Sequence, residues 1–237
     1  MMKHFRPLLV ILTLGLSLAG ARTGLAQVHA GDVELGVSGG QITVSETLFE
    51  SDFLPFGPSL LFTDEPGFDS EINTFNSGDM VGFDVTRQLF FWDGTQLTSA
   101  AGNPGLMIDF FGQPTVTVDE NTTFDPGFNF PTVATGDDGV IHRHLDFSLP
   151  SSAPVGAYGL VLQMDSPQYT TSEEFLIVFN NDLGNAQFEA GVDAIEQAAF
   201  AVPEPSTYAM WTAGFTLLAI GWGWRTLKQR RLKAPAA

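Results

Sequence analysis

The chain of 237 residues contains no cysteine. Disulfide bonds, thiolate metal sites and catalysis by a cysteine nucleophile are therefore excluded. A chain of this length can bury a sizeable hydrophobic core without cross-links, so the missing cysteine does not by itself identify the compartment. The length predicts one folded domain, or two at most.

Basic residues are scarce between the two ends of the chain. Residues 27–201 contain two arginines, Arg87 and Arg143, and 26 of the 27 acidic residues, which gives this stretch a formal net charge of −24. The whole chain has a net charge of −17, because the other basic residues lie near its two ends. So acidic a middle excludes binding to nucleic acid through a basic face.

Motifs of known enzyme families are also scarce. The His-Glu-x-x-His pattern of metalloproteases and the Walker pattern of nucleotide-binding proteins do not occur. Pairs of carboxylates are numerous, but in so acidic a stretch they arise by chance and single out no glycosidase site. We therefore predict a protein that is not an enzyme, with a hydrolase as the least favoured function.

The first 26 residues have the three parts of a secretory signal peptide. Lys3 and Arg6 supply the positive charge, residues 8–19 are apolar, and residues 24–26 (Gly-Leu-Ala) place small side chains at a cleavage site. We expect export by the secretion machinery and cleavage by signal peptidase. A cut after Ala26 keeps His29 in the mature protein, whereas a second plausible cut after residue 30 removes it.

A second apolar segment lies near the C-terminus. Residues 206–224 contain no charge, and at ~1.5 Å per residue they approach the ~30 Å hydrocarbon core of a bilayer. Tryptophans lie near both ends of this segment, and a basic tail follows at residues 225–233. We predict a transmembrane helix whose basic tail is cytoplasmic and whose acidic N-terminal side lies outside the cytoplasm.

Residues 202–207 (Val-Pro-Glu-Pro-Ser-Thr) precede this apolar segment and the basic tail. The three features in this order resemble the PEP-CTERM sorting signal, which places a sorting domain at residues 202–237. The resemblance implies a Gram-negative source and an exosortase that recognises Pro203, Glu204 and Pro205. It also implies removal of the tail and delivery to the cell surface or extracellular matrix. The two prolines keep this segment extended, which suits access by a processing enzyme and equally suits a linker.

The segment 27–186 has the pattern of a β domain. Glycine, proline, asparagine and aspartate interrupt it about every ten residues, as in an antiparallel sandwich or barrel. We predict a mainly β fold, an antiparallel β-sandwich of the jelly-roll kind, with strands at 32–37, 41–48, 58–63, 80–85, 88–92, 106–111, 114–118, 139–149, 157–165 and 173–180.

Local patterns refine this expectation. Gly39-Gly40 and Asp93-Gly94 are turn signals for hairpins, and the run from Phe175 to Phe179 is apolar on both faces, as in a central buried strand. Residues 187–201 differ, because apolar side chains recur there at helical spacing. We predict one short amphipathic helix after the β domain.

Two of the histidines lie two residues apart, at His142 and His144. In a strand over 139–149 these rings and Asp146 share one face, while Ile141 and the apolar residues that alternate with them share the other. A His-x-His pair on a strand can bind one divalent metal, with Asp146 or His29 as the third ligand. Nitrogen and oxygen ligands suit zinc, manganese, iron or copper. The alternative is an ordinary polar, solvent-facing strand.

Short motifs around these histidines resemble the choice-of-anchor M, or surface-anchored, domain family. They are residues 29–33 (His-Ala-Gly-Asp-Val), residues 142–147 (His-Arg-His-Leu-Asp-Phe) and residues 154–158 (Pro-Val-Gly-Ala-Tyr). The family implies a surface protein, in some cases beside metal-transport systems. This chain departs from it by one extra residue between His29 and Asp32 and by Asp146-Phe147 after the histidine pair, in place of the family's Asn-Trp.

Acidic pairs in turn-like contexts allow a different cation site. Calcium takes six to eight oxygen ligands, and extracellular β domains use it structurally. None of the pairs has EF-hand spacing, so a solvated acidic surface is the alternative. The pairs lie at Asp64-Glu65, Asp69 with Glu71, Asp119-Glu120 and Asp137-Asp138.

Taken together, the sequence predicts an exported protein of the cell surface or extracellular matrix. Its β domain is expected to have a non-enzymatic binding or structural role, with a matrix polysaccharide or a cation as ligand. The alternative is a metal-binding surface protein that uses His142 and His144, with zinc or calcium as the bound ion. No other cofactor is predicted.

Overall fold

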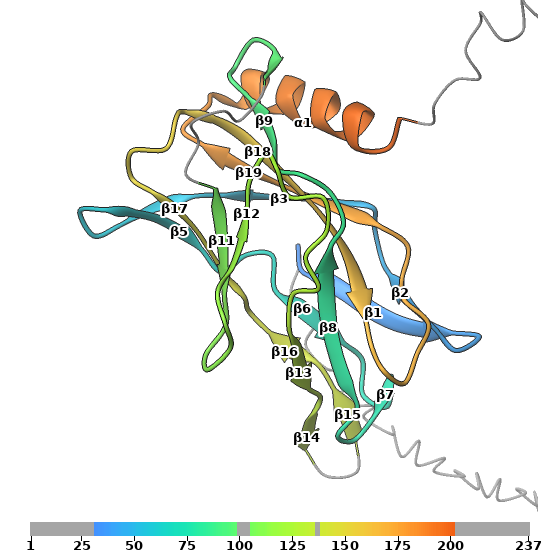
Figure 1. Ribbon diagram of the computed structural model, residues 1–237. Helices are drawn as coiled ribbons and strands as arrows, with labels where there is room; N and C mark the ends of the chain where they lie inside the picture. The colour runs from blue at the N-terminus through green and yellow to red at the C-terminus, as the bar shows by residue number, and fades with distance from the viewer. Residues whose placement is uncertain (1–30, 99–104, 136–137, 202–237) are drawn as a thin grey trace, which may run out of the picture.

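The computed structural model describes residues 31–98, 105–135 and 138–201 (Figure 1). The predicted signal peptide, His29 and the sorting segment 202–237 lie outside these ranges. Among the helices of the described ranges, none has the length and apolar character needed to cross a membrane. The described residues form β-strands in four sheets and one helix, which confirms a mainly β fold.

Two sheets contain most of the long strands. The seven-stranded sheet is formed by β3 (Leu48–Asp52), β8 (Met80–Val85), β9 (Phe90–Trp92), β10 (Leu97–Thr98), β13 (Asn129–Pro131), β18 (Gly156–Asp165) and β19 (Phe175–Asn181). The five-stranded sheet has the order β12 (Val116–Val118), β11 (Leu106–Asp109), β17 (Asp146–Pro150), β5 (Leu60–Thr63) and β4 (Leu54–Phe56).

Two smaller sheets complete the domain. The four-stranded sheet has the order β16 (His142–Arg143), β6 (Phe68–Ser70), β1 (Val33–Ser38) and β2 (Gln41–Val44), and the three-stranded sheet has the order β14 (Val133–Thr135), β15 (Asp138–Val140) and β7 (Phe75–Asn76). Most pairs are antiparallel, as predicted, but β1 with β6 and β3 with β19 are parallel. The jelly-roll sandwich stays a prediction.

Strand β19 is buried on both faces, as its sequence predicts. Phe175, Ile177 and Phe179 enter the large core shared by the sheets, whereas Leu176 and Val178 enter a second core on the opposite face. A strand without a solvent face has no polar alternation, because side chains on both sides are removed from water. The seven-stranded sheet is therefore the central layer of the domain.

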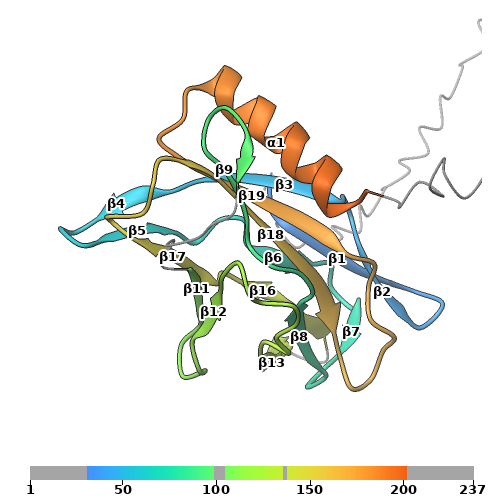
Figure 2. The same cartoon turned by 45° about the horizontal axis from the view of Figure 1, so that its top comes forward.

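Helix α1 (Asn185–Ala199) covers that opposite face, where it lies across β18, β19 and β9 (Figures 1 and 2). Its buried stripe of Phe188, Val192, Ile195 and Ala199 is the one that helical spacing predicts. Gly191 lies on the same buried face, and a Cβ atom there would be 2.8 Å from Cδ1 of Trp92. This glycine lowers helix propensity but lets the helix approach the sheet closely.

Both predicted hairpin turns are present. Gly39 and Gly40 join β1 to β2 with φ values of 60° and 85°, the left-handed conformation that glycine adopts without steric cost. Residues 36–40 also spell Gly-x-Ser-x-Gly. In a nucleophile elbow that pattern joins a strand to a helix, whereas here Ser38 ends β1 and pairs with Gln41.

The predicted strand over 139–149 is wrong as a single element. It forms three short strands in three different sheets: β15 pairs with β7, β16 with β6, and β17 with β5 and β11. The alternation of faces survives the breaks, because Ile141, Leu145 and Phe147 are all buried. Ser148, which by alternation would share the polar face of His142, His144 and Asp146, is instead buried.

The strand predicted over 41–48 is also wrong, because β2 ends at Val44 and β3 begins at Leu48. The chain then passes from the seven-stranded to the five-stranded sheet through Phe53, which separates β3 from β4. Phe53 anchors this crossing, because it stacks on Phe179 with ring centroids 5.0 Å apart. Residues 50–69 are called the sheet corner below.

Candidate functional site

The histidine pair lies where β16 joins β6. His142 is paired in register with Asp69, and His144 follows two residues later. The two ring centroids are 5.4 Å apart, with an interplanar angle of 78°. The expectation that both rings lie close together is therefore met, although His144 lies just beyond the end of its strand.

Each ring is fixed through its Nδ1 atom. Nδ1 of His142 lies 2.6 Å from Oδ1 of Asp69, a buried carboxylate. Nδ1 of His144 lies 3.0 Å from the backbone carbonyl oxygen of Asp64. A carbonyl oxygen can only accept a hydrogen bond, so Nδ1 of His144 is the donor to Asp64. An ionised carboxylate also only accepts, so Nδ1 of His142 is the donor to Asp69. In the neutral form of either ring, this arrangement leaves the lone pair on Nε2.

Gly67 lets the His144 ring approach the backbone closely. A Cβ atom on Gly67 would be 2.7 Å from Cε1 of His144, so a side chain there would displace the ring. The backbone N–H of Gly67 donates to Oδ1 of Asp32 at 2.9 Å, and Asp32 is itself buried. The position of His144 is thus set by β6 and by the segment before it.

The carboxylates around the sheet corner raise the pKa values of His144 and Glu65. Burial lowers the pKa of His144, but the hydrogen bond to Asp64 and the charges of Glu65, Asp32 and Asp64 outweigh it and raise the pKa above its ordinary value. Burial raises the pKa of Glu65, and Asp32 raises it further. Oε1 of Glu65 lies 3.9 Å from Nδ1 of His144.

Of the two predicted third ligands, His29 and Asp146, the structure describes one. His29 lies outside the described residues. Asp146 begins β17 opposite Asp109, and its pKa is raised by burial and by the charges of Asp64 and Asp109. Over residues 31–98, 105–135 and 138–201, no group of three or more histidine or acidic side chains has a metal-binding arrangement.

The partners of the histidines were visible in the sequence only as separate features. Asp64, Glu65 and Asp69 belong to the acidic turn clusters, and Asp32 belongs to the motif that resembles a surface-anchored family. Asp69 lies 73 positions from His142 in the sequence, and Asp64 lies 80 positions from His144. Only the pairing of β16 with β6 brings them together.

Another acidic pair has a local role. The side chain of Asp119 accepts hydrogen bonds from the backbone N–H of Asn121 and from the hydroxyl of Thr122. The backbone hydrogen bond of Asn121 is the main cause that lowers the pKa of Asp119. This carboxylate caps its own turn.

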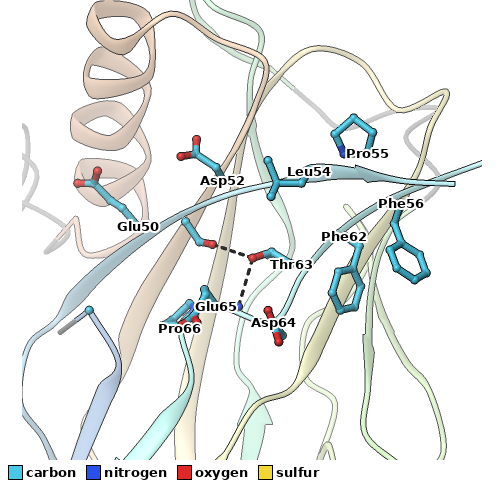
Figure 3. A pocket seen from close by; sticks show the side chains of 12 residues that line it. Glu50, Asp52, Leu54, Pro55, Phe56, Phe62, Thr63, Asp64, Glu65 and Pro66 are labelled. Carbon is cyan, nitrogen blue, oxygen red and sulfur yellow. Dashed lines mark hydrogen bonds between the residues drawn. The ribbon is translucent and has the colours of Figure 1, made fainter. Parts of the chain in front are cut away.

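A pocket of about 560 Å³ opens at the sheet corner, beside the segment that holds His144 (Figure 3). Its walls come from β3, β4 and β5 and the segment that follows β5. The hydroxyl groups of Ser51 and Thr63, two of its lining residues, are hydrogen-bonded to each other, with their oxygens 3.1 Å apart. The lining residues are Gly31, Glu50, Ser51, Asp52, Leu54, Pro55, Phe56, Phe62, Thr63, Asp64, Glu65 and Pro66.

Comparison with protein families finds a sorting signal at the C-terminal end of the chain. Residues 201–231 match the PEP-CTERM protein-sorting motif, which confirms the resemblance seen in the sequence. This motif implies processing by an exosortase. The match begins where the β domain ends, and the resemblance to the surface-anchored family stays a prediction. No curated protein matches the chain.

Proposed function

We propose that the β domain is a non-enzymatic binding module of the cell surface or extracellular matrix, and that it holds a divalent metal through Nε2 of His142 and His144. The observation that carries this proposal is the fixing of both rings through Nδ1. Metal-ligating histidines donate their other ring N–H to a carboxylate or carbonyl oxygen in this way, which sets the tautomer and the ring orientation.

The spacing of the two rings supports the same role. With zinc–nitrogen bonds of about 2.0–2.1 Å and a tetrahedral angle, the centroids of two ligating rings lie about 5 Å apart. The centroids of His142 and His144 are 5.4 Å apart. Neutral imidazole favours zinc or another transition metal over calcium, which takes oxygen ligands.

The proposal is tested by titrating the purified full chain with zinc and with calcium while its melting temperature is followed. Binding to the native state alone stabilises it by about 2.7 kcal/mol at a metal concentration of 100 Kd. We expect zinc to raise the melting temperature, and the double variant His142→Ala with His144→Ala to abolish that rise. An unchanged zinc response in the double variant would refute the proposal.

The third ligand is identified by two single variants. His29→Ala and Asp146→Asn each remove one of the predicted ligands and leave the histidine pair in place. We expect one of them to weaken zinc binding tenfold or more while the other has no effect. If both variants bind zinc as the unmodified chain does, neither residue is a ligand and the metal takes solvent at its remaining positions.

For the sorting segment we propose that residues 206–224 span the inner membrane with the tail in the cytoplasm, until an exosortase cuts near Pro203, Glu204 and Pro205. The match over residues 201–231 supports this proposal. Replacing these three residues by alanine should trap a full-length, membrane-bound form. Release of the normal mature protein from that variant would contradict processing at this motif.

A further inference from the structure

The pocket at the sheet corner combines acidic and apolar side chains, and those on β3 and β4 lie outside the buried core. Glu50 and Asp52 lie on β3, and Leu54 and Phe56 follow on β4 after the break at Phe53. Asp52 and Phe56, four residues apart, are separated by about 13 Å of extended strand. The wall is thus acidic at one end and apolar at the other (Figure 3).

The apolar end is exposed although its side chains are large. Leu54 is 65% and Phe56 63% exposed, and Phe56 packs against Phe62 with ring centroids 5.2 Å apart. Pro55 and Pro66 complete the apolar lining. Adjacent large apolar side chains that stay in water on the wall of a cavity are typical of a ligand site rather than of a domain surface.

The charged end has one sign. Four carboxylates line the pocket, those of Glu50, Asp52, Asp64 and Glu65, and no lysine, arginine or histidine is among the lining residues. Burial raises the pKa of Glu50, and the charges of Glu189 and Asp52 raise it further. A cation in the pocket relieves this repulsion, whereas an anion increases it.

We propose that this pocket binds a linear organic polyamine, with its methylene chain along Leu54, Phe56 and Phe62 and its ammonium groups against the carboxylates of Glu50, Asp52 and Asp64. A polyamine joins its ammonium groups through methylene spacers, so ammonium groups can meet the carboxylates at one end of the wall while a spacer lies along the apolar side chains at the other. The aromatic faces of Phe56 and Phe62 add attraction for an ammonium group. The pocket volume of about 560 Å³ lies within the range of small-molecule sites.

The site is distinct from the proposed metal site, although the two adjoin at Asp64 and Glu65. Asp64 contacts His144 through its backbone carbonyl and lines the pocket, so its carboxylate is not the group that fixes the ring. Polyamine binding therefore does not depend on zinc, and it can be measured with a chelator present.

The test is calorimetric titration of the full chain with spermidine at low salt in the presence of a chelator. We expect saturable binding that weakens as salt rises. The variant Glu50→Gln with Asp52→Asn should weaken it tenfold or more. Its control, Glu46→Gln with Glu173→Gln, removes two exposed charges outside the pocket. Equal losses in the two double variants would show a general attraction to an acidic surface and would overturn the proposal.

A second pair of variants tests the apolar end. Phe56→Ala should weaken spermidine binding severalfold, whereas Phe111→Ala, which removes a ring that is 97% exposed outside the pocket, should leave it unchanged. Neither ring is in the buried core, so both variants are expected to keep the melting temperature of the unmodified chain. An unchanged spermidine affinity of Phe56→Ala would overturn the proposed ligand class. So would displacement of spermidine by magnesium ions added at the same concentration of positive charge.

Discussion

The face of the seven-stranded sheet that α1 covers and the sheet corner have opposite character. On one face of the seven-stranded sheet, α1 buries Val192 and Ile195 against β18 and β19, and the core there is apolar. At the sheet corner the chain passes to another sheet, and carboxylates, histidines and exposed aromatic rings gather. The covered face is an apolar core, whereas the corner exposes charged and aromatic side chains.

The difference teaches where a β domain can place polar groups. In the middle of a covered sheet every backbone group is paired and every side chain meets a neighbour, so a charge there would be buried without a partner. Where a strand leaves one sheet for another, its side chains have fewer neighbours on one side. Glu50, Asp52 and His142 stay accessible there while Phe53 and Asp69 anchor the backbone.

The largest expected effect is on the covered face. Ile195→Ala removes a fully buried side chain and should lower the free energy of unfolding by about 2–5 kcal/mol, because a cavity remains beneath the helix. Urea denaturation measures the loss, and the exposed Gln197→Ala serves as the control. Zinc binding should be retained in the folded variant, so a loss of metal affinity comparable to His142→Ala would break the separation of the two regions.

Gly191→Ala tests the close approach of the helix to the sheet. Alanine normally stabilises a helix by about 1 kcal/mol relative to glycine. Here the added Cβ would lie 2.8 Å from Trp92, so we expect a net destabilisation of about 1–3 kcal/mol from overpacking. The reverse change at an exposed helical site, Ala190→Gly, reports propensity alone. A more stable Gly191→Ala variant would show that the helix can shift without cost.

Asp69→Asn tests the corner with a side chain of the same shape. Because the carboxylate fixes the His142 ring through Nδ1, the variant should weaken zinc binding about 10–100-fold while both proposed ligands remain. Calorimetric titration measures the change, and Asp193→Asn on the exposed face of α1 removes one charge as a control. Unchanged zinc affinity in Asp69→Asn would mean that this contact does not orient the ring.

The smallest effect is expected at an ion pair away from both regions. Arg87 Nη2 lies 2.7 Å from Glu174 Oε2. Burial alone would raise the pKa of Glu174, but the hydrogen bond and charge of Arg87 outweigh it and lower the pKa. The stability it contributes is therefore present above the ordinary value of 4.5 and is lost as the pH falls through the lowered pKa.

Because both side chains are partly exposed, the contribution should be below about 1 kcal/mol. The difference in unfolding free energy between the unmodified chain and Glu174→Gln, measured from pH 7 to pH 3, should shrink toward zero at the acidic end. Glu196→Gln serves as the comparison variant. Glu196 is also partly exposed, but among the described residues it forms no ion pair like that of Arg87 with Glu174. A difference that grows on acidification would contradict the sign of the shift.

Periodicity predicted the elements that are long or buried on a regular face. The stripe of α1, the two-sided burial of β19 and the glycine turn after Ser38 follow from local patterns, because each needs only neighbouring residues to be recognised. It missed the short strands β7, β10, β13 and β14 as well as β3, β4 and β6. Acidic residues interrupt β3 and β6, and a proline lies inside β4; these three strands build the corner.

The sequence identified the two histidines of the candidate site but not their partners, and metal binding by the pair stays a prediction. The two histidines were found from their spacing, and their closeness follows from that spacing. Asp69 and the Asp64 carbonyl could not be assigned to them, because contacts between residues more than 70 positions apart depend on which strands pair. The pocket was not predicted at all, since two of the three strands that form its walls, β3 and β4, are absent from the sequence prediction.

The sequence by itself determined that this protein is exported and carries a C-terminal sorting signal, because such signals are read as linear segments by the machinery that recognises them. It also determined a mainly β domain with a net charge of −24 over residues 27–201. Only the tertiary structure decided where that charge is concentrated into a site. Strand pairing brings Asp69 to His142 and Asp64 to His144, and the passage of the chain through Phe53 opens a pocket beside them.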